Sequence, residues 1–180
     1  MLLLCVIAAA ALPAAALRLP LSDGPPPGHT GGFGEPTCRV CHQPGEPRRG
    51  SVTIEGLPAS FIAGQTYVFE VVSRAPGLTR AGFQLAARFA SGAPAGVLGT
   101  EEPTRVGFSH DSTRQLRYAQ HTAAGTAAHG NEQRWRMTWQ APRQRMPVVF
   151  HAASVIASDD NSPLDDDVVT TADTVAATIP

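Results

Sequence analysis

The stretch Glu132-Gln-Arg-Trp-Arg-Met-Thr-Trp-Gln140 alternates large apolar side chains with polar ones. Trp135, Met137 and Trp139 share one face of an extended chain, and Arg and Thr side chains occupy the other face. Successive side chains of a strand point to opposite faces of its sheet. The stretch therefore predicts a β-strand that packs its aromatic face into a hydrophobic core.

The same alternation recurs along the chain from Ser51 onward. Apolar residues share one face in five further segments, which are residues 51–54, 67–71, 83–89, 148–152 and 168–171. Gly- and Pro-containing turn signals separate these segments. Seven or eight short strands in about 130 residues are typical of an antiparallel sandwich. We expect an all-β fold, an immunoglobulin-like antiparallel β-sandwich over residues 51–180.

The composition excludes several other classes of protein. The chain has 180 residues with 17 Gly, 16 Pro and only 16% charged residues, which disfavours a bundle of long helices. Its formal net charge of −1 gives no overall basic surface, so a nucleic acid partner is not expected.

The N-terminus indicates export. An apolar run from Met1 to Leu17 ends in small residues around Ala14-Ala-Ala16, as at a signal-peptidase site. Pro13 and the short span argue against a membrane-spanning helix. We therefore expect residues 1–19 to be a signal peptide and the mature chain to be periplasmic or extracellular, at the cell surface. Membrane association would then come only through partners or an uncleaved signal.

A Gly/Pro-rich N-terminal arm, residues 20–50, contains the sequence Thr37-Cys-Arg-Val-Cys-His42. This C-x-x-C-H motif is the attachment signature of c-type haem. Two thiols at this spacing reach the two vinyl groups on one porphyrin edge, and the adjacent His ligates the iron. The motif predicts one haem c, held by thioethers to Cys38 and Cys41 with His42 as the proximal ligand. Export agrees, because haem c is attached outside the cytoplasm.

Three other interpretations of the two cysteines remain open from the sequence. A structural disulfide is compatible with an oxidising compartment. A zinc site would need histidines as its remaining ligands. A thioredoxin-like dithiol normally follows a strand at the start of a helix, whereas Gly/Pro coil precedes Cys38.

The sixth ligand of the iron is less well determined. The candidates in the mature chain are His29, His110, His121, His129, His151, Met137 and Met146. Met137 shares the face of the two tryptophans and is expected in the core, and Met146 is flanked by Pro. His121 ends a strand-like run just before a Gly-containing loop, where it can face something docked on the sandwich. His151 and His29 are the next candidates for the distal ligand.

Four stretches in this order resemble a family of exported bacterial reeler-like proteins of the choice-of-anchor V type. They are Gly28–His42, Tyr118–Gly125, Trp135–Pro142 and Phe150–Asn161. The resemblance covers about residues 24–172. It implies an immunoglobulin-like sandwich with a haem-bearing arm laid against it, and it implies His121, in the pair His121-Thr122, as the distal iron ligand.

These observations favour a monohaem c-type cytochrome that transfers electrons outside the cytoplasm, as a carrier or a subunit of a larger redox complex. Its partners would be redox proteins, including a membrane-associated electron-transfer complex. The alternative is a reeler-like surface binding or adhesion module whose haem is structural or sensory. A peroxidase-like enzyme is disfavoured because no acid/base pair is evident. The acidic stretch 159–167 offers oxygen donors for Ca²⁺ but lacks the spacing of an EF-hand.

Overall fold

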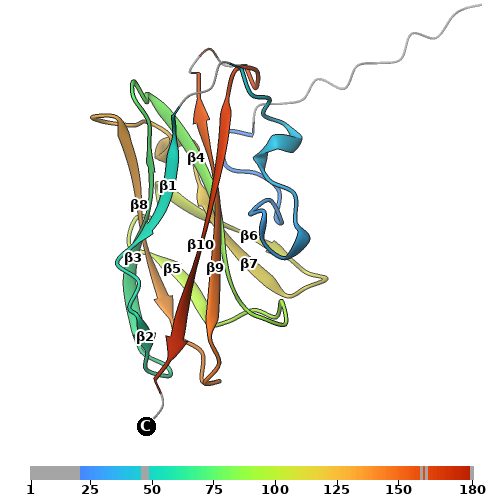
Figure 1. The fold of residues 1–180 in the computed structure, drawn as a ribbon, viewed down its shortest axis with the longest axis vertical. Helices are drawn as coiled ribbons and strands as arrows, with labels where there is room; N and C mark the ends of the chain where they lie inside the picture. The colour runs from blue at the N-terminus through green and yellow to red at the C-terminus, as the bar shows by residue number, and fades with distance from the viewer. Residues whose placement is uncertain (1–20, 46–48, 159, 161, 179–180) are drawn as a thin grey trace, which may run out of the picture.

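The computed structural model describes residues 21–45, 49–158, 160 and 162–178. The expected signal peptide, residues 1–19, lies outside the described residues. The described part contains ten strands in two facing sheets (Figure 1). One sheet has the order β1-β3-β8-β5, which are Ser51–Glu55, Thr66–Arg74, Glu132–Gln140 and Val97–Thr100. The other has the order β2-β10-β9-β4-β7-β6, which are Ser60–Phe61, Asp167–Ala177, Val148–Ala157, Arg80–Phe89, Leu116–His121 and Val106–Asp111.

The pairing is antiparallel throughout, except that β10 and the two-residue β2 run parallel. The expected all-β sandwich is therefore confirmed. The sequence pattern missed β2, β5 and β6. Strands β2 and β5 have two and four residues, which is too short to show alternation. Gly107 and His110 interrupt the apolar pattern of β6.

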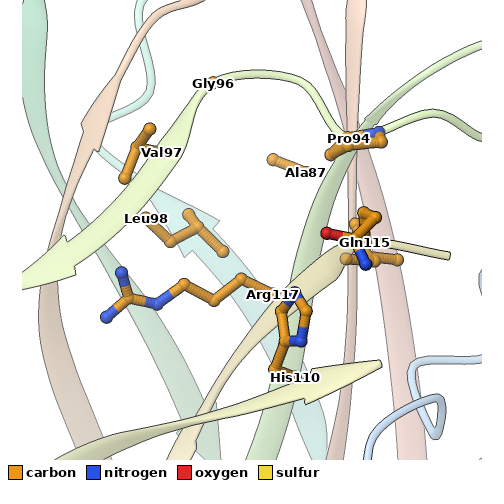
Figure 2. Close-up of a pocket in the computed structure, with 9 residues that line it drawn as sticks. Ala87, Pro94, Gly96, Val97, Leu98, His110, Gln115 and Arg117 are labelled. Carbon is orange, nitrogen blue, oxygen red and sulfur yellow. The ribbon is translucent and has the colours of Figure 1, made fainter. Parts of the chain in front are cut away.

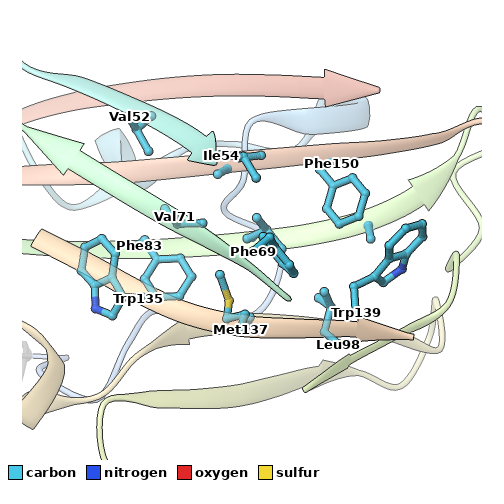
Figure 3. Close-up of a cluster of buried hydrophobic side chains, with 14 of the residues drawn as sticks. Val52, Ile54, Phe69, Val71, Phe83, Leu98, Trp135, Met137, Trp139 and Phe150 are labelled. Carbon is cyan, nitrogen blue, oxygen red and sulfur yellow. The ribbon is translucent and has the colours of Figure 1, made fainter. Parts of the chain in front are cut away.

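The core between the sheets is built by the alternation that the sequence shows. Trp135, Met137 and Trp139 are fully buried in β8. Figure 3 shows them facing Phe83 of β4 and Phe150 of β9. The Phe83 and Trp135 ring centroids lie 4.5 Å apart, and the indole N–H of Trp139 donates to the carbonyl of Ala95 at 2.9 Å. Met137 is therefore a core residue, as predicted.

The N-terminal arm lies along the outer face of the six-stranded sheet (Figure 1). It forms two short 3₁₀ helices, η1 (Gly32–Gly34) and η2 (Cys38–Val40), and a third, η3 (Ala123–Gly125), follows β7. A side-chain amide of the sheet makes hydrogen bonds to the backbone of the arm. Gln84 of β4 accepts a hydrogen bond from the His29 N–H and donates one to the carbonyl of Pro26. The described residues contain no helix with the length and hydropathy that a membrane span requires.

We predict that the sandwich folds without the arm. All residues of the main core cluster come from Val52 or later in the chain. A chain that begins at Ser51 should give a β-type circular dichroism spectrum and melt cooperatively, at a lower temperature than the full mature chain because the outer face loses its cover. A product with β-type secondary structure but no cooperative melt would show instead that the arm supplies necessary core.

Candidate cofactor site

The C-x-x-C-H motif adopts a compact helical turn. Residues Cys38–Val40 form η2, and the Thr37 side chain accepts a hydrogen bond from the Arg39 N–H at its start. The backbone N–H groups of Cys41 and His42 both donate to the carbonyl of Cys38, at 3.1 and 2.9 Å. Residues three apart eclipse one another in a 3₁₀ helix. The turn therefore brings the two cysteines to one side, which is the arrangement that attachment to one porphyrin edge requires.

Cys38 packs against small apolar side chains of the sheet. It is buried with Ala153 and Val155 of β9 and Val168 of β10. Burial raises the pKa of the Cys38 thiol to about 12. A reactive dithiol needs a lowered thiol pKa, so this surrounding disfavours the thioredoxin-like interpretation.

The other two interpretations of the cysteines also lack support in the described part of the chain. Neither Cys38 nor Cys41, its two cysteines, is in a disulfide. No group of three or more His, Cys, Asp or Glu side chains converges there as zinc ligands would.

His42 is held by a buried carboxylate. Its Nδ1 lies 2.6 Å from Oδ2 of Asp166, whose side chain is 2% exposed, whereas the His42 side chain is 34% exposed. The other oxygen of Asp166 accepts the backbone N–H of Ser158 at 2.7 Å. This arrangement commits Nδ1 and leaves Nε2 of His42 for another partner. The sequence placed Asp166 only in an acidic stretch considered for Ca²⁺, and its pairing with His42 was not foreseen.

His121 lies at the end of β7, with its ring over Gly82 of β4. A Cβ at Gly82 would lie 2.6 Å from Cε1 of His121, so the missing side chain makes room for the imidazole. Nδ1 of His121 accepts a hydrogen bond from the Phe83 N–H at 2.9 Å, and it lies 3.2 Å from the Phe83 carbonyl oxygen. Donation from the Phe83 N–H requires an unprotonated Nδ1, whereas donation from Nδ1 to the carbonyl requires the Nδ1–H tautomer. Only the Nδ1–H tautomer leaves the Nε2 lone pair for a ligand.

The strand register brings the motif and His121 together. Val168, Val155 and Gly82 are paired neighbours across β10, β9 and β4, on the outer face of the sheet. Cys38 packs on the first two, and the His121 ring covers the third. Neighbouring strands lie about 4.8 Å apart. The C-x-x-C-H turn and His121 therefore occupy adjacent positions of one row, although 79 residues separate His42 from His121.

The pKa of His121 also reflects this proximity. It lies below its usual value of 6.5, chiefly because burial disfavours the charged ring. A hydrogen bond to the Phe83 backbone opposes this effect, and charge on His42 lowers the pKa further. A positive charge on His42 therefore acts on the His121 ring.

The next two candidates for the distal ligand have other neighbours. His151 is half-buried under the arm, where its ring centroid lies 5.2 Å from that of Phe33 in an edge-on contact. Its pKa is lowered by burial and by Arg88. The Nδ1 of His29 lies 2.9 Å from the carbonyl oxygen of Pro26, within the arm.

The remaining candidates lie away from the motif. Met146 is exposed and precedes β9, whereas His42 sits at the opposite end of that ten-residue strand, about 30 Å away at the usual rise per residue. His129 lies in the turn before β8. His110 lines a surface hollow of about 220 Å³ between β5 and the β6–β7 hairpin (Figure 2). The hollow is not lined by the motif or by His121.

A buried charged cluster, not foreseen from the sequence, fastens the arm to the sheet. Glu35 of the arm accepts hydrogen bonds from Thr30, from Arg88 of β4 and from Tyr118 of β7. The side chains of Glu35 and Arg88 are 2% and 4% exposed. Burial alone would raise the pKa of Glu35, but the hydrogen bonds from Thr30, Tyr118 and Arg88 together hold it below 4.5. The contact joins residues 53 apart, so no local sequence pattern reveals it.

We predict that Glu35→Gln destabilises the protein at neutral pH and much less in acid. Removing one partner of a buried ion pair costs about 3–5 kcal/mol, because the other charge stays buried. A carboxyl whose pKa is lowered by folding stabilises the native state above its unfolded-state value of 4.5, and this contribution is lost as the pH falls through the folded value. Urea unfolding of both chains should show their difference narrowing below pH 4.5. A pH-independent difference would contradict the ion-pair account.

Comparison with known proteins identifies the fold. No family model matches the chain, and no curated protein matches it. The Reelin-N domain of F-spondin is 17% identical with a TM-score of 0.51, over 79% of this chain and 96% of that one. A human F-spondin reeler domain structure gives 17% identity and a TM-score of 0.49, over 76% of this chain and 92% of that one. A cohesin module from a Clostridium perfringens family 33 glycoside hydrolase gives 10% and 0.50, over 73% and 98%. At these identities the likeness shows a reeler-like β-sandwich fold and nothing about activity.

Proposed function

We propose that the protein is a monohaem c-type cytochrome that carries electrons outside the cytoplasm. One observation carries the proposal: the C-x-x-C-H turn and His121 meet on adjacent positions of the same face of the sheet. The donors fit the group. Two thiols lie on one side of a helical turn, and two imidazoles have Nδ1 within hydrogen-bond distance of protein groups, so Nε2 would be the nitrogen of each that ligates iron.

In this proposal each residue has a defined task. Cys38 and Cys41 would tether the haem covalently, so that a deep haem pocket would not be needed. His42 and His121 would be the two protein ligands of the iron. The haem itself supplies a one-electron ferric–ferrous couple. Because two imidazoles of the chain would ligate the iron, the site would be suited to electron transfer and not to binding a substrate at the iron.

The solvent side of the motif gives electrons a route to a partner. Val40 is 56% exposed, and Cys41 and His42 are half-buried. A redox protein that docks on this side would approach the attached edge closely. The proposal includes a signal peptide over residues 1–19 and a periplasmic or cell-surface location, because haem c is attached after export. The haem-bearing arm would then be residues 20–50, and the sandwich residues 51–180.

The experiment is a ligation and electron-exchange test on the purified holoprotein. We expect six-coordinate low-spin spectra in both oxidation states, no binding of carbon monoxide by the reduced form, and reversible oxidation by a small soluble redox protein. Carbon monoxide binding would indicate an open iron position and favour an enzyme. A low-spin haem that exchanges electrons with no such protein would favour the reeler-like binding module.

A further inference from the structure

Asp166 is placed to act on the proposed proximal ligand from behind. Its Oδ2 is 2.6 Å from Nδ1 of His42, and its Oδ1 accepts the Ser158 N–H at 2.7 Å. Both oxygens are therefore used, and the carboxylate has one orientation. With a 2% exposed side chain, Asp166 is shielded from water, so its charge acts on the imidazole with little screening.

The backbone fixes the distance between the two residues. The N–H of Gln43 donates to the carbonyl of Pro163 at 2.8 Å, and the N–H of Asp166 donates to the carbonyl of Gln43 at 3.0 Å. These two bonds join the chain directly after the motif to the segment directly before β10. These backbone hydrogen bonds of the fold therefore hold His42 and Asp166 next to each other.

We propose that Asp166 is a positioning residue that fixes His42 in the Nδ1–H tautomer and lowers the reduction potential of the haem that His42 ligates. The inference rests on the proposed function. A metal-binding His that donates its other N–H to a carboxylate is held in orientation and becomes a stronger donor. A His ligand that is a stronger donor, with a carboxylate charge behind it, favours ferric over ferrous iron, because the oxidised centre carries one more positive charge. Axial ligation and its hydrogen bonds are main controls on haem potential.

The sequence offers a matched control in the next residue. Asp167 carries the same charge, but its Oδ1 lies 3.6 Å from the Arg39 guanidinium and accepts the N–H of Val168. Asp166→Asn and Asp167→Asn therefore remove the same charge from neighbouring positions, and only the first changes the contact with His42. Comparing them separates the hydrogen bond from the general field of the acidic segment.

The test measures the midpoint potential of the holoprotein and of both variants. Mutating a residue that hydrogen-bonds to a metal ligand commonly lowers metal affinity or activity by a factor of about 10–100. A tenfold loss in the preference for ferric iron raises a one-electron potential by about 59 mV. We expect at least that rise for Asp166→Asn and a clearly smaller one for Asp167→Asn, with altered electron paramagnetic resonance g values only in the first. Equal shifts in the two variants would overturn the inference.

A second measurement does not depend on haem. In the full-length chain with Cys38 and Cys41 replaced by Ser, long-range ¹H–¹⁵N spectra report which ring nitrogen of His42 carries the proton. We expect the Nδ1–H form, and finding Nε2–H would overturn the inference whatever the potentials show. If Asp166→Asn does not fold, Asp166→Glu keeps the carboxylate and should hold the potential near that of the parent. If the parent protein carries no haem, the proposed function is refuted. The tautomer measurement can still be made on that protein, so failure of the proposed function and failure of this inference are distinguishable.

Discussion

Replacing both Cys38 and Cys41 with Ser should abolish covalent haem staining of the denatured protein. Each thiol would form one thioether, so each single variant should keep part of the staining and only the double variant should lose all of it. Ser is close to Cys in size and can occupy the same helical turn, in which the Cys38 carbonyl accepts from two N–H groups. The loss should therefore reflect missing sulfur and not a collapsed arm.

The control is the fold of the double variant. Because the main core comes from Val52 and later residues, the far-ultraviolet circular dichroism of the double variant should match that of the parent. A host that matures a known c-type cytochrome in the same culture excludes a failure of the maturation machinery. Staining that survives in the folded double variant would refute attachment through this motif.

His121→Ala should convert a low-spin ferric spectrum to a high-spin one. Removing the distal imidazole opens a coordination position, and weakly bound water in its place should also shift the potential upward. His151→Ala and His29→Ala are matched controls, because both histidines lie under or in the arm with other partners. Ferric absorbance and electron paramagnetic resonance distinguish the spin states in all three variants.

Gly82→Ala tests the same assignment without removing a ligand. The new methyl group would lie 2.6 Å from Cε1 and 3.0 Å from Nε2 of His121, so the ring must move. We expect a partial high-spin population in this variant. If His121→Ala and Gly82→Ala stay low-spin while His151→Ala or His29→Ala changes, the distal ligand is that other residue. If every variant stays low-spin, the sixth ligand comes from a residue outside this set or from another chain.

The parts of the structure that the sequence predicts are those with local signals. The alternation around Trp135, Met137 and Trp139 gives the core strand directly, because burial and strand period coincide there. The C-x-x-C-H spacing predicts that the two cysteines share one side of the chain, because residues three apart fall on one side of a single helical turn. Both signals lie within a few residues of the chain.

The parts that the sequence does not predict depend on distant pairing. Asp166 is one of three consecutive aspartates, and only the fold buries this one against His42, 124 residues away. The sequence does not show that Glu35 and Arg88 form a buried ion pair, because the pair exists only when the arm packs on the sheet. Gly82 stands in a regular strand, and its need for a missing side chain follows only from the position of His121.

The most direct test is a pyridine haemochrome spectrum combined with the intact mass of the exported protein. We expect a c-type spectrum with one haem per chain. The intact mass should equal one covalently bound haem plus a chain that lacks about its first 17–20 residues, because signal cleavage removes them. A mass equal to the polypeptide alone, from cells that mature another c-type cytochrome normally, would contradict the proposed haem attachment.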